Sequence, residues 1–387
     1  MSHHPQPIVR AFWTPGVFVL VAFMAIAAVF VLARYIAGIG YVSNLSNAYP
    51  WGLWIGVDVA SGVALAAGGF TTSAVAHIFG KHRYESVVRS ALLTAALGYT
   101  FVVLGLLVDV GRSWAIWKPL VFRNFNSALF EVAMCVMVYL HVLYIELIPA
   151  VAERFGKKIT ILNELNKRLA KFMWIFIIAG VVLSCMHQSS LGTLMLIAPT
   201  KLHPLWYTPV LPLLFLSSAF TVGYPMVIFE TTLVTSSLKL EDEMNVLSPL
   251  SKFTIATLGI YLLIKIADML WRGSYIYLFE GSTQSNAFLV ELIIGGIVPW
   301  LLLMSRKVRS SRRSLFITAC LIIGGVMMNR INVFITGYMP PFAEHSYFPS
   351  VGEIAITVGL ISALMFIYRL AVTYLPILSA KKLEETS

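Results

Sequence analysis

Charged side chains are scarce in this chain of 387 residues. Only 12% of the residues are Asp, Glu, Lys or Arg, whereas 58% are hydrophobic and the mean hydropathy is +0.82. An ordinary soluble domain is about one quarter charged. The composition therefore excludes a typical soluble protein and predicts an integral membrane protein.

Cysteine is also scarce, and several common motifs are missing. The three cysteines lie far apart, each inside an apolar run: Cys135, Cys185 and Cys320. This spacing excludes a disulfide framework and a cysteine-rich iron–sulfur or zinc motif, so we expect buried structural thiols and no metal site. The chain also lacks a Walker loop, a dinucleotide fingerprint and a Ser-His-Asp pattern in a supporting context.

Histidines are too few within the apolar runs to favour a haem. Of the eight in the chain, only His77, His141 and His187 fall within or at the end of a predicted helix, and no helix holds two. Haem iron in membrane cytochromes is usually held by histidines. We therefore expect neither haem nor an iron–sulfur cluster in this chain. If electrons pass through this protein, they must go almost directly from a partner at the surface to a mobile carrier in the lipid phase.

What the chain has in abundance is long apolar runs, and a helix needs about 20 mostly apolar residues to span a bilayer. We predict an all-α, polytopic membrane protein with a single domain over residues 1–387. Its transmembrane helices, about ten in number, are expected near 16–38, 51–79, 87–109, 126–149, 168–187, 208–236, 252–271, 287–304, 314–336 and 350–375. The first run is too long for the core of a signal peptide, and we expect it to remain as a helix.

Lys and Arg lie mainly in the loops on the side of the N-terminus, with clusters at 154–171 and 306–313. Because basic loops remain in the cytoplasm, both termini are expected to be cytoplasmic. This bias accounts for the net charge of +10 without a nucleic-acid partner. The opposite loops are rich in Trp, Tyr, Pro, Asn and His, and we expect them to dock a protein.

One polar and aromatic segment, from His187 to Trp206, separates two apolar runs near the middle of the chain. We place His187 at the end of the fifth helix and His203 within the following loop. The segment is expected to form a lid over a site at the outer face.

Ionisable residues inside membrane helices are costly and are therefore candidates for function. Asp58 and Glu131 lie ~10 Å and ~8 Å from the outer ends of their helices, at 1.5 Å per residue. Asp109 and Arg112 flank the outer end of the third helix. Together with His187, these side chains are expected to converge at one level near the outer face.

Proton transfer is the function that these positions suggest for Glu131, with His141 and Glu146 further along the same helix. The three residues do not form one stripe at 3.6 residues per turn, so a path between them needs water or neighbouring helices. Structural interpretations stay open beside this one. Glu131 can be a satisfied buried carboxyl, and two further sets can be simple ion pairs: Asp109 with Arg112, and Lys265 with Asp268 at i,i+3.

Several motifs occur in order along nearly the whole chain: Tyr49-Pro50-Trp51-Gly52 with Asp58, Asp109-Val110-Gly111-Arg112, Phe125-Asn126-Ser127 with Phe130-Glu131, Met186-His187-Gln188-Ser189-Ser190-Leu191-Gly192, His203-Pro204-Leu205-Trp206 and Tyr347-Phe348-Pro349-Ser350. With these motifs the chain resembles the NrfD/PsrC-like integral membrane subunits. Within that family it is most similar to the HybB-type subunit of quinone-linked [NiFe] hydrogenase.

The resemblance implies two four-helix bundles plus flanking helices, and a menaquinone or ubiquinone site near the outer face. It also implies a periplasmic, ferredoxin-like iron–sulfur subunit that receives electrons from the large and small [NiFe] hydrogenase subunits. It makes Glu131 a candidate for proton transfer. It carries over no single residue for the quinone head group, so those candidates come from position and chemistry: Asp58, Asp109, Arg112, His187 and His203.

We therefore predict a quinone-reactive subunit of a respiratory [NiFe] hydrogenase complex, with coupled proton transfer. The first alternative is a quinol-oxidising subunit of a polysulfide, nitrite or sulfite system. The second is a secondary transporter that binds an ion or solute near the midplane, which would be expected to purify alone. A passive anchor does not explain the buried carboxylates.

Overall fold

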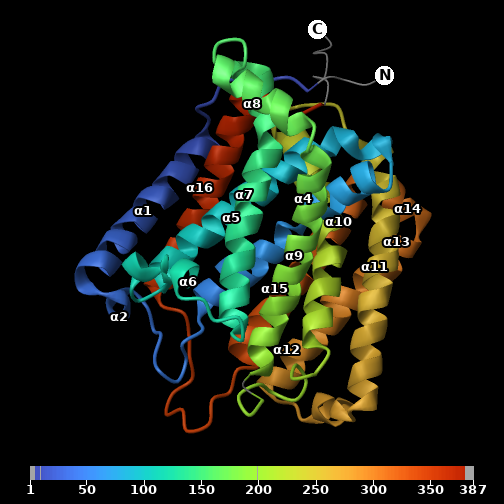
Figure 1. Cartoon of the computed structure of the whole chain (residues 1–387). Helices are drawn as coiled ribbons and strands as arrows, with labels where there is room; N and C mark the ends of the chain where they lie inside the picture. Colours follow the sequence, from blue (N-terminus) through green and yellow to red (C-terminus); the bar gives the residue numbers. More distant parts are fainter. Residues whose placement is uncertain (1–4, 9, 198, 380–387) are drawn as a thin grey trace.

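Ten helical spans that are long and apolar enough to cross a membrane make up most of the computed structural model, which describes residues 5–8, 10–197 and 199–379 (Figure 1). No β-strand occurs among these residues, and the all-α prediction is confirmed. The spans are α1 (Pro15–Ala37), Trp54–Ile78, His82–Asp109 with α5 (Glu85–Asp109), α7 (Ala128–Phe155), α9 (Met173–Leu196), α10 (Leu211–Ser237), α11 (Met244–Trp271), Thr283–Met304, Arg312–Thr336 and α16 (Val351–Tyr374).

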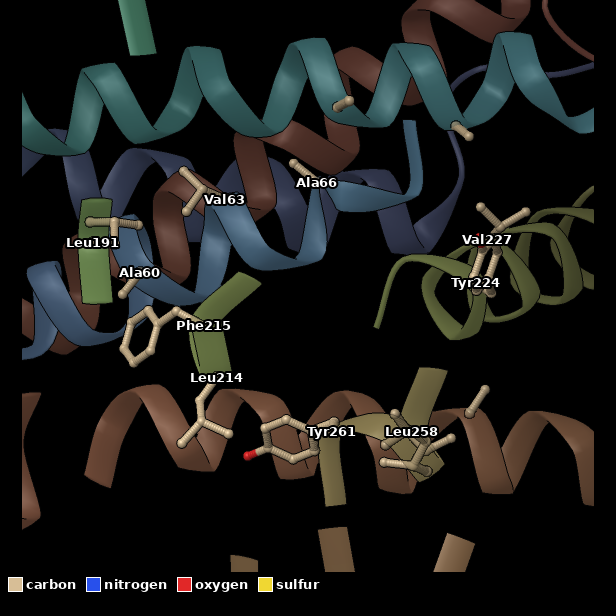
Figure 2. Close-up of a cluster of buried hydrophobic side chains, with 14 of the residues drawn as sticks. Ala60, Val63, Ala66, Leu191, Leu214, Phe215, Tyr224, Val227, Leu258 and Tyr261 are labelled. Carbon is tan, nitrogen blue, oxygen red and sulfur yellow. The ribbon is translucent and has the colours of Figure 1, made fainter. Parts of the chain in front are cut away.

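Two four-helix bundles stand side by side, as the family resemblance implies. In the first bundle, the span Trp54–Ile78 packs with α5 and α9, and α7 packs with α5 and α9. In the second bundle, α10 packs with α11 and the span Arg312–Thr336, and the span Thr283–Met304 packs with those two. The bundles meet where α10 contacts α9 and α4 (Ala67–Ser73). In Figure 2, Ala60 and Val63 of the second span lie in one buried cluster with Leu191 of α9 and Phe215 of α10.

The flanking pair consists of α1 and α16, which pack along each other beside the bundles (Figure 1). Gly359 of α16 faces Ala27 of α1 so closely that a side chain at this glycine would overlap the Ala27 Cβ atom. Small residues of this kind allow membrane helices to approach closely. The backbone N–H of Gln6 donates to the Leu378 carbonyl at 3.1 Å, so the described ends of the chain lie on the same side.

One predicted helix boundary is wrong in a way that matters for the site. The fifth helix was expected to end at His187, but α9 continues to Leu196. Its polar residues are compatible with a helix because Ser189 and Ser190 both donate their hydroxyls to the Met186 carbonyl one turn earlier, at 2.9 and 2.7 Å. Gln188 donates to a neighbouring helix. The loop after α9 is therefore much shorter than predicted.

π-helical turns interrupt three spans. The second span is built from η1 (Trp54–Ser61), α3 (Gly62–Leu65), α4 and η2 (Ala74–Ile78), and both η elements are π-helical. The other two π-helical turns are η6 (Ile293–Ile297), which joins α12 (Thr283–Leu292) to α13 (Val298–Met304), and η7 (Asn332–Thr336), which follows α15 (Arg312–Ile331). π-turns within helices are frequent at functional sites. Asp58 lies in η1, so this π-helical element is a candidate part of the functional site.

Candidate functional site

Glu131 lies in the first turn of α7, next to the interior of the first bundle. Ser127 caps this helix by accepting a hydrogen bond from the Phe130 N–H. The Glu131 Oε1 atom lies 2.7 Å from the Ser190 hydroxyl of α9, within hydrogen-bond distance. Glu131 is exposed and Ser190 is buried, so the carboxyl links the bundle surface to its interior. This contact exists only because α9 extends beyond His187.

Three aromatic side chains form a buried group further inside the same bundle. The Tyr99 hydroxyl of α5 lies 3.1 Å from His187 Nδ1, and both side chains are fully buried. The Tyr99 ring packs edge-on against Tyr139 of α7, with 4.6 Å between ring centroids. His187 Nε2 and Gln188 Oε1 have no hydrogen-bond partner among the described residues. Buried polar atoms normally have partners, so these two atoms are suited to binding a water molecule.

Glu146 lies two helical turns along α7 from Tyr139, on the same face. A Cβ atom built on Gly180 of α9 would lie only 2.9 Å from Glu146 Oε1, so glycine is needed for the carboxyl to occupy this position. His141 is placed differently: its side chain is exposed, and its Nδ1 atom lies 2.7 Å from the Met137 carbonyl of its own helix. The structure thus brings Glu146, but not His141, towards the α7–α9 interface that also holds the aromatic group.

A second set of acidic residues lies at the expected outer end of the molecule, where η1, α5 and α16 meet. Asp109 is close enough to both Asp58 and Glu353 for the carboxyl groups to interact electrostatically. Asp58 Oδ2 accepts a hydrogen bond of 2.9 Å from the Thr357 hydroxyl of α16. Glu353 is fully buried and accepts a hydrogen bond from the Tyr347 hydroxyl. Three helices therefore place carboxyl groups together.

Two motifs that are far apart in the sequence meet at this point. A Cβ atom on Gly52 would lie 2.5 Å from the Tyr347 hydroxyl and 2.9 Å from Glu353 Oε1, so the Tyr49–Gly52 motif leaves room for the Tyr347–Ser350 motif. The Leu53 N–H donates to the Tyr347 hydroxyl at 2.8 Å. Burial and the bond to Glu353 raise the pKa of Tyr347, which keeps its proton available for donation to Glu353.

Asp109 and Arg112 do not form the ion pair that the sequence allowed. No ion pair joins them in the part of the chain that the structure describes, and the Arg112 side chain is exposed. Instead the buried Arg34 of α1 caps the end of α5, donating to the carbonyls of Val108 and Val110 at 2.7 and 2.6 Å. Arg34 satisfies carbonyls that a helix end leaves without partners.

An elongated cavity of about 620 Å³ lies between the α1–α16 pair and the two bundles. Asp58 lines it near the expected outer end. Near the other end, the Tyr368 hydroxyl donates to Glu230 Oε1 at 2.7 Å, and both residues line the cavity. Most of the remaining lining is apolar. Of the five residues predicted to bind a quinone head group, Asp58 is the one found in the described lining.

The cavity and the buried aromatic group lie on either side of α3. Gly62 and Leu65 of this short helix line the cavity. The carbonyl of Val63, in the same helix, accepts a hydrogen bond of 2.9 Å from Gln188 Nε2, next to His187. Thus α3 is the partition between a mainly apolar chamber and a polar interior. The five side chains that were predicted to converge near the outer face do not meet at one point. They are divided between the acidic site, the polar interior of the first bundle and the surface: Asp58, Asp109, Arg112, Glu131 and His187.

His203 lies neither at the cavity nor in the buried aromatic group. It belongs to the loop between α9 and α10, which covers the second bundle. Its ring contacts Trp206 and Tyr277, with centroid separations of 5.9 and 5.7 Å, and its Nε2 atom lies 3.9 Å from Glu280 Oε2. Burial lowers the pKa of His203, although Glu280 acts in the opposite direction. No residue of this loop is found in the described lining of the cavity, so the segment that was predicted to be a lid does not cover the cavity.

A polar network in the second bundle was missed from the sequence. Glu291 of α12 is at its centre, accepting hydrogen bonds from Lys265, from Trp206 Nε1 at 3.0 Å, and from the side-chain amides of Asn329 and Asn332, each at 2.8 Å. All five residues are buried. The charge of Glu291 therefore has both a countercharge and several donors, as a buried ion pair requires.

The predicted neutralisation of Lys265 by Asp268 is wrong. Lys265 pairs with Glu291 across the bundle, whereas Asp268 pairs with Arg272 at 2.9 Å and accepts a hydrogen bond from Thr208 at 2.8 Å. Lys265 faces the bundle interior, while Asp268 lies near the helix end and faces the loop. One feature of the sequence could have predicted this pair. Glu291 is the single charged residue of its apolar run and therefore needs a partner on another helix.

The described cysteines are free, with Cys135 buried and Cys185 and Cys320 half-buried. No group of three or more His, Cys, Asp or Glu side chains that could hold a metal ion occurs in the described ranges.

Residues 41–341 match the family described as Polysulphide reductase, NrfD. The chain is 38% identical to a protein of Nitratidesulfovibrio vulgaris, over 95% of the chain and 96% of that protein. It is 33% identical to the probable Ni/Fe-hydrogenase 2 b-type cytochrome subunit of Escherichia coli, over 99% of the chain and 97% of that subunit. It is 27% identical to the integral membrane subunit of menaquinone reductase of Nitratidesulfovibrio vulgaris, with 94% and 91% covered.

The Escherichia coli relative is named as a b-type cytochrome subunit, which raises the question of haem. His77 is exposed at the end of η2, and His141 is bonded to its own helix. His187 is fully buried with Nδ1 next to the Tyr99 hydroxyl. None of these three histidines is found in the described lining of the 620 Å³ cavity, and one exposed, one helix-bonded and one fully buried ring do not fit a haem held between two histidines.

Proposed function

The chain belongs to the polysulphide reductase NrfD family, and on this premise we propose that it is the quinone-reactive membrane subunit of a respiratory [NiFe] hydrogenase complex. It passes electrons from a periplasmic iron–sulfur subunit, supplied by the hydrogenase large and small subunits, to menaquinone or ubiquinone in the bacterial inner membrane. The similarity to the hydrogenase 2 and menaquinone reductase subunits supports this proposal. The chain works only with these partners.

The observation that carries the proposal is the 620 Å³ cavity with Asp58 near one end and apolar residues along its length. Ligand sites for apolar molecules combine an apolar lining with a few placed polar groups. The quinone head group lies against Asp58 and the isoprenoid tail follows the apolar lining next to it. Reduction to the quinol consumes two electrons, from the partner, and two protons. Asp58, oriented by its hydrogen bond from Thr357, delivers a proton to a quinone oxygen.

Protons reach the outer part of the molecule from the cytoplasmic side through the first bundle. Glu146, the Tyr139–Tyr99–His187 group and Glu131 lie along one interface of α7, α5 and α9. Glu146 and Glu131 are fifteen residues apart, or ~22 Å along a helix at 1.5 Å per residue. Water is needed to complete so long a path. Gln188, whose amide bonds to α3, is the contact of this route with the cavity wall.

The test measures hydrogen-driven quinone reduction and proton translocation in vesicles that contain the whole complex. Asp58→Asn is expected to lower quinone reduction by at least about tenfold, because a positioned acid typically contributes 10² or more to rate. Glu131→Gln is expected to abolish translocation. Glu164→Gln, an exposed change on α8 (Thr160–Ala170), is the matched control and leaves both unchanged. Normal reduction and translocation in both test variants would remove Asp58 and Glu131 from the mechanism.

A second candidate is the same kind of subunit in another quinone-linked respiratory complex, which the similarity to the menaquinone reductase subunit favours. The two differ in the catalytic partner. Purification of the chain in mild detergent decides between them, since a hydrogenase large subunit accompanies it only in the first case. A chain that purifies alone and transports a solute would contradict both.

A further inference from the structure

A pocket on the basic side of the molecule is lined by the end of α10 and the start of α15. Its lining combines two arginines and three hydroxyl side chains with two apolar residues: Thr232, Leu233, Ser236, Ser237, Arg312, Arg313 and Phe316. This is an amphipathic site, with cationic and hydroxyl donors beside apolar surface.

Arg312 is held in a fixed orientation within this pocket. Its Nη2 atom donates to the Thr232 carbonyl at 3.2 Å, and to the hydroxyls of Thr235 and Ser236 at 2.8 Å each. All three partners lie on α10, and none is a carboxylate. The other guanidinium N–H groups make no further hydrogen bond to the part of the chain that the structure describes.

The basic residues beside this pocket form no ion pair with a carboxylate of the described residues. Five basic residues lie between 306 and 313, and no Asp or Glu occurs between Glu291 and Glu344. No ion pair within the described ranges involves any of these five residues. Charge complementarity therefore calls for an anionic ligand.

The pocket adjoins the large cavity and shares part of its wall. Leu233 and Ser237 line both of them, and Phe316 stacks on Phe229, another cavity residue, with 5.4 Å between ring centroids. A ligand anchored at the arginines thus has an apolar route along α10 for a hydrocarbon chain. A free anion would make no use of this route.

We propose that this pocket binds an anionic phospholipid, with the phosphate at Arg312 and Arg313 and one acyl chain directed past Leu233 into the inner end of the cavity. Basic pockets between membrane helices on the cytoplasmic side suit such head groups. The bound lipid fills the end of the cavity that lies opposite Asp58. The proposal is independent of which respiratory complex the chain serves.

The test counts lipids bound to the full-length chain by native mass spectrometry, with phosphatidylglycerol, phosphatidylcholine and inorganic phosphate as probes. The unchanged chain is expected to retain one phosphatidylglycerol and to bind it at least about fivefold more tightly than phosphatidylcholine. Arg313→Gln, an exposed change, is expected to lower phosphatidylglycerol affinity about fivefold. Arg312→Gln should lower it further.

Lys307→Gln is the matched control, since Lys307 is an exposed residue of the same basic segment outside the described pocket lining. It should bind lipid as the unchanged chain does. Equal phosphatidylglycerol binding in the control and in Arg313→Gln would overturn the proposal, and so would equal affinity for phosphatidylcholine. Competition by millimolar inorganic phosphate would show a free-anion site instead. If Arg312→Gln fails to fold, Arg313→Gln decides the matter alone.

Discussion

At the scale of single residues, a glycine controls the position of an acid. Glu146 packs against α9 at Gly180, where a Cβ atom would come within 2.9 Å of its carboxylate oxygen. Gly52 leaves room in the same way for Tyr347 and Glu353. Neither glycine has a reactive side chain, but the space that each one leaves allows a carboxyl group to lie where it does.

Gly180→Ala is therefore expected to displace the Glu146 carboxyl and to lower proton translocation by about tenfold or more, because small displacements of reacting groups can cost up to 10²-fold. The measurement is proton uptake during hydrogen-driven quinone reduction in vesicles. Gly324→Ala is the control, since a Cβ atom at this other helical glycine meets nothing within 4 Å. Translocation that is unchanged in Gly180→Ala would show that Glu146 needs no such placement.

At the scale of elements, the extension of α9 to Leu196 changes the role of the Gln188–Ser190 motif. These residues are part of a membrane helix, in which Ser190 contacts Glu131 and Gln188 donates a hydrogen bond to α3. A loop with the same sequence would have no fixed register against α7. The hydroxyls that bond back to Met186 explain how a polar run remains helical.

Hydrogen exchange distinguishes the helix from a loop. Backbone amides of residues 188–196 are expected to exchange at least about a hundredfold more slowly than those of the exposed loop 122–126, because helical amides exchange only after local opening. Mass spectrometry of the detergent-solubilised chain gives both rates in one sample. Equal rates in the two segments would contradict the helix and, with it, the Ser190–Glu131 contact.

At the scale of the whole molecule, the ten spans and the pairing of Gln6 with Leu378 place the described ends of the chain on one side. The distribution of Lys and Arg predicts that this side is cytoplasmic. The acidic site at Asp58 and Glu353 then faces the periplasm, and the Arg312–Arg313 pocket lies at the cytoplasmic leaflet. Both proposals depend on this orientation.

Cysteine labelling in intact cells measures it. In a background in which Cys135, Cys185 and Cys320 are replaced by Ala, an impermeant maleimide is expected to label Glu344→Cys at once. Lys157→Cys should be labelled only after the membrane is permeabilised. Both positions are exposed, so access of the reagent is decided by the side of the membrane. The opposite labelling pattern would show that the protein has the reverse orientation in the membrane.

The amino-acid sequence by itself determined the all-α class, the approximate number of spans and the placement of Asp58, Glu131 and Glu146 within long apolar helices. These follow from the length of apolar runs and from the rarity of charge within them, which are local properties. Helix ends near polar residues were less certain, as α9 shows.

Only the tertiary structure decided which groups meet. Lys265 pairs with Glu291 instead of Asp268, and His187 faces Tyr99 instead of the cavity. The meeting of Gly52 with Tyr347 could not be foreseen either. Each of these contacts depends on the rotation of a helix about its axis and on its neighbours in the bundle. Packing between distant segments sets both, and a lone sequence records neither.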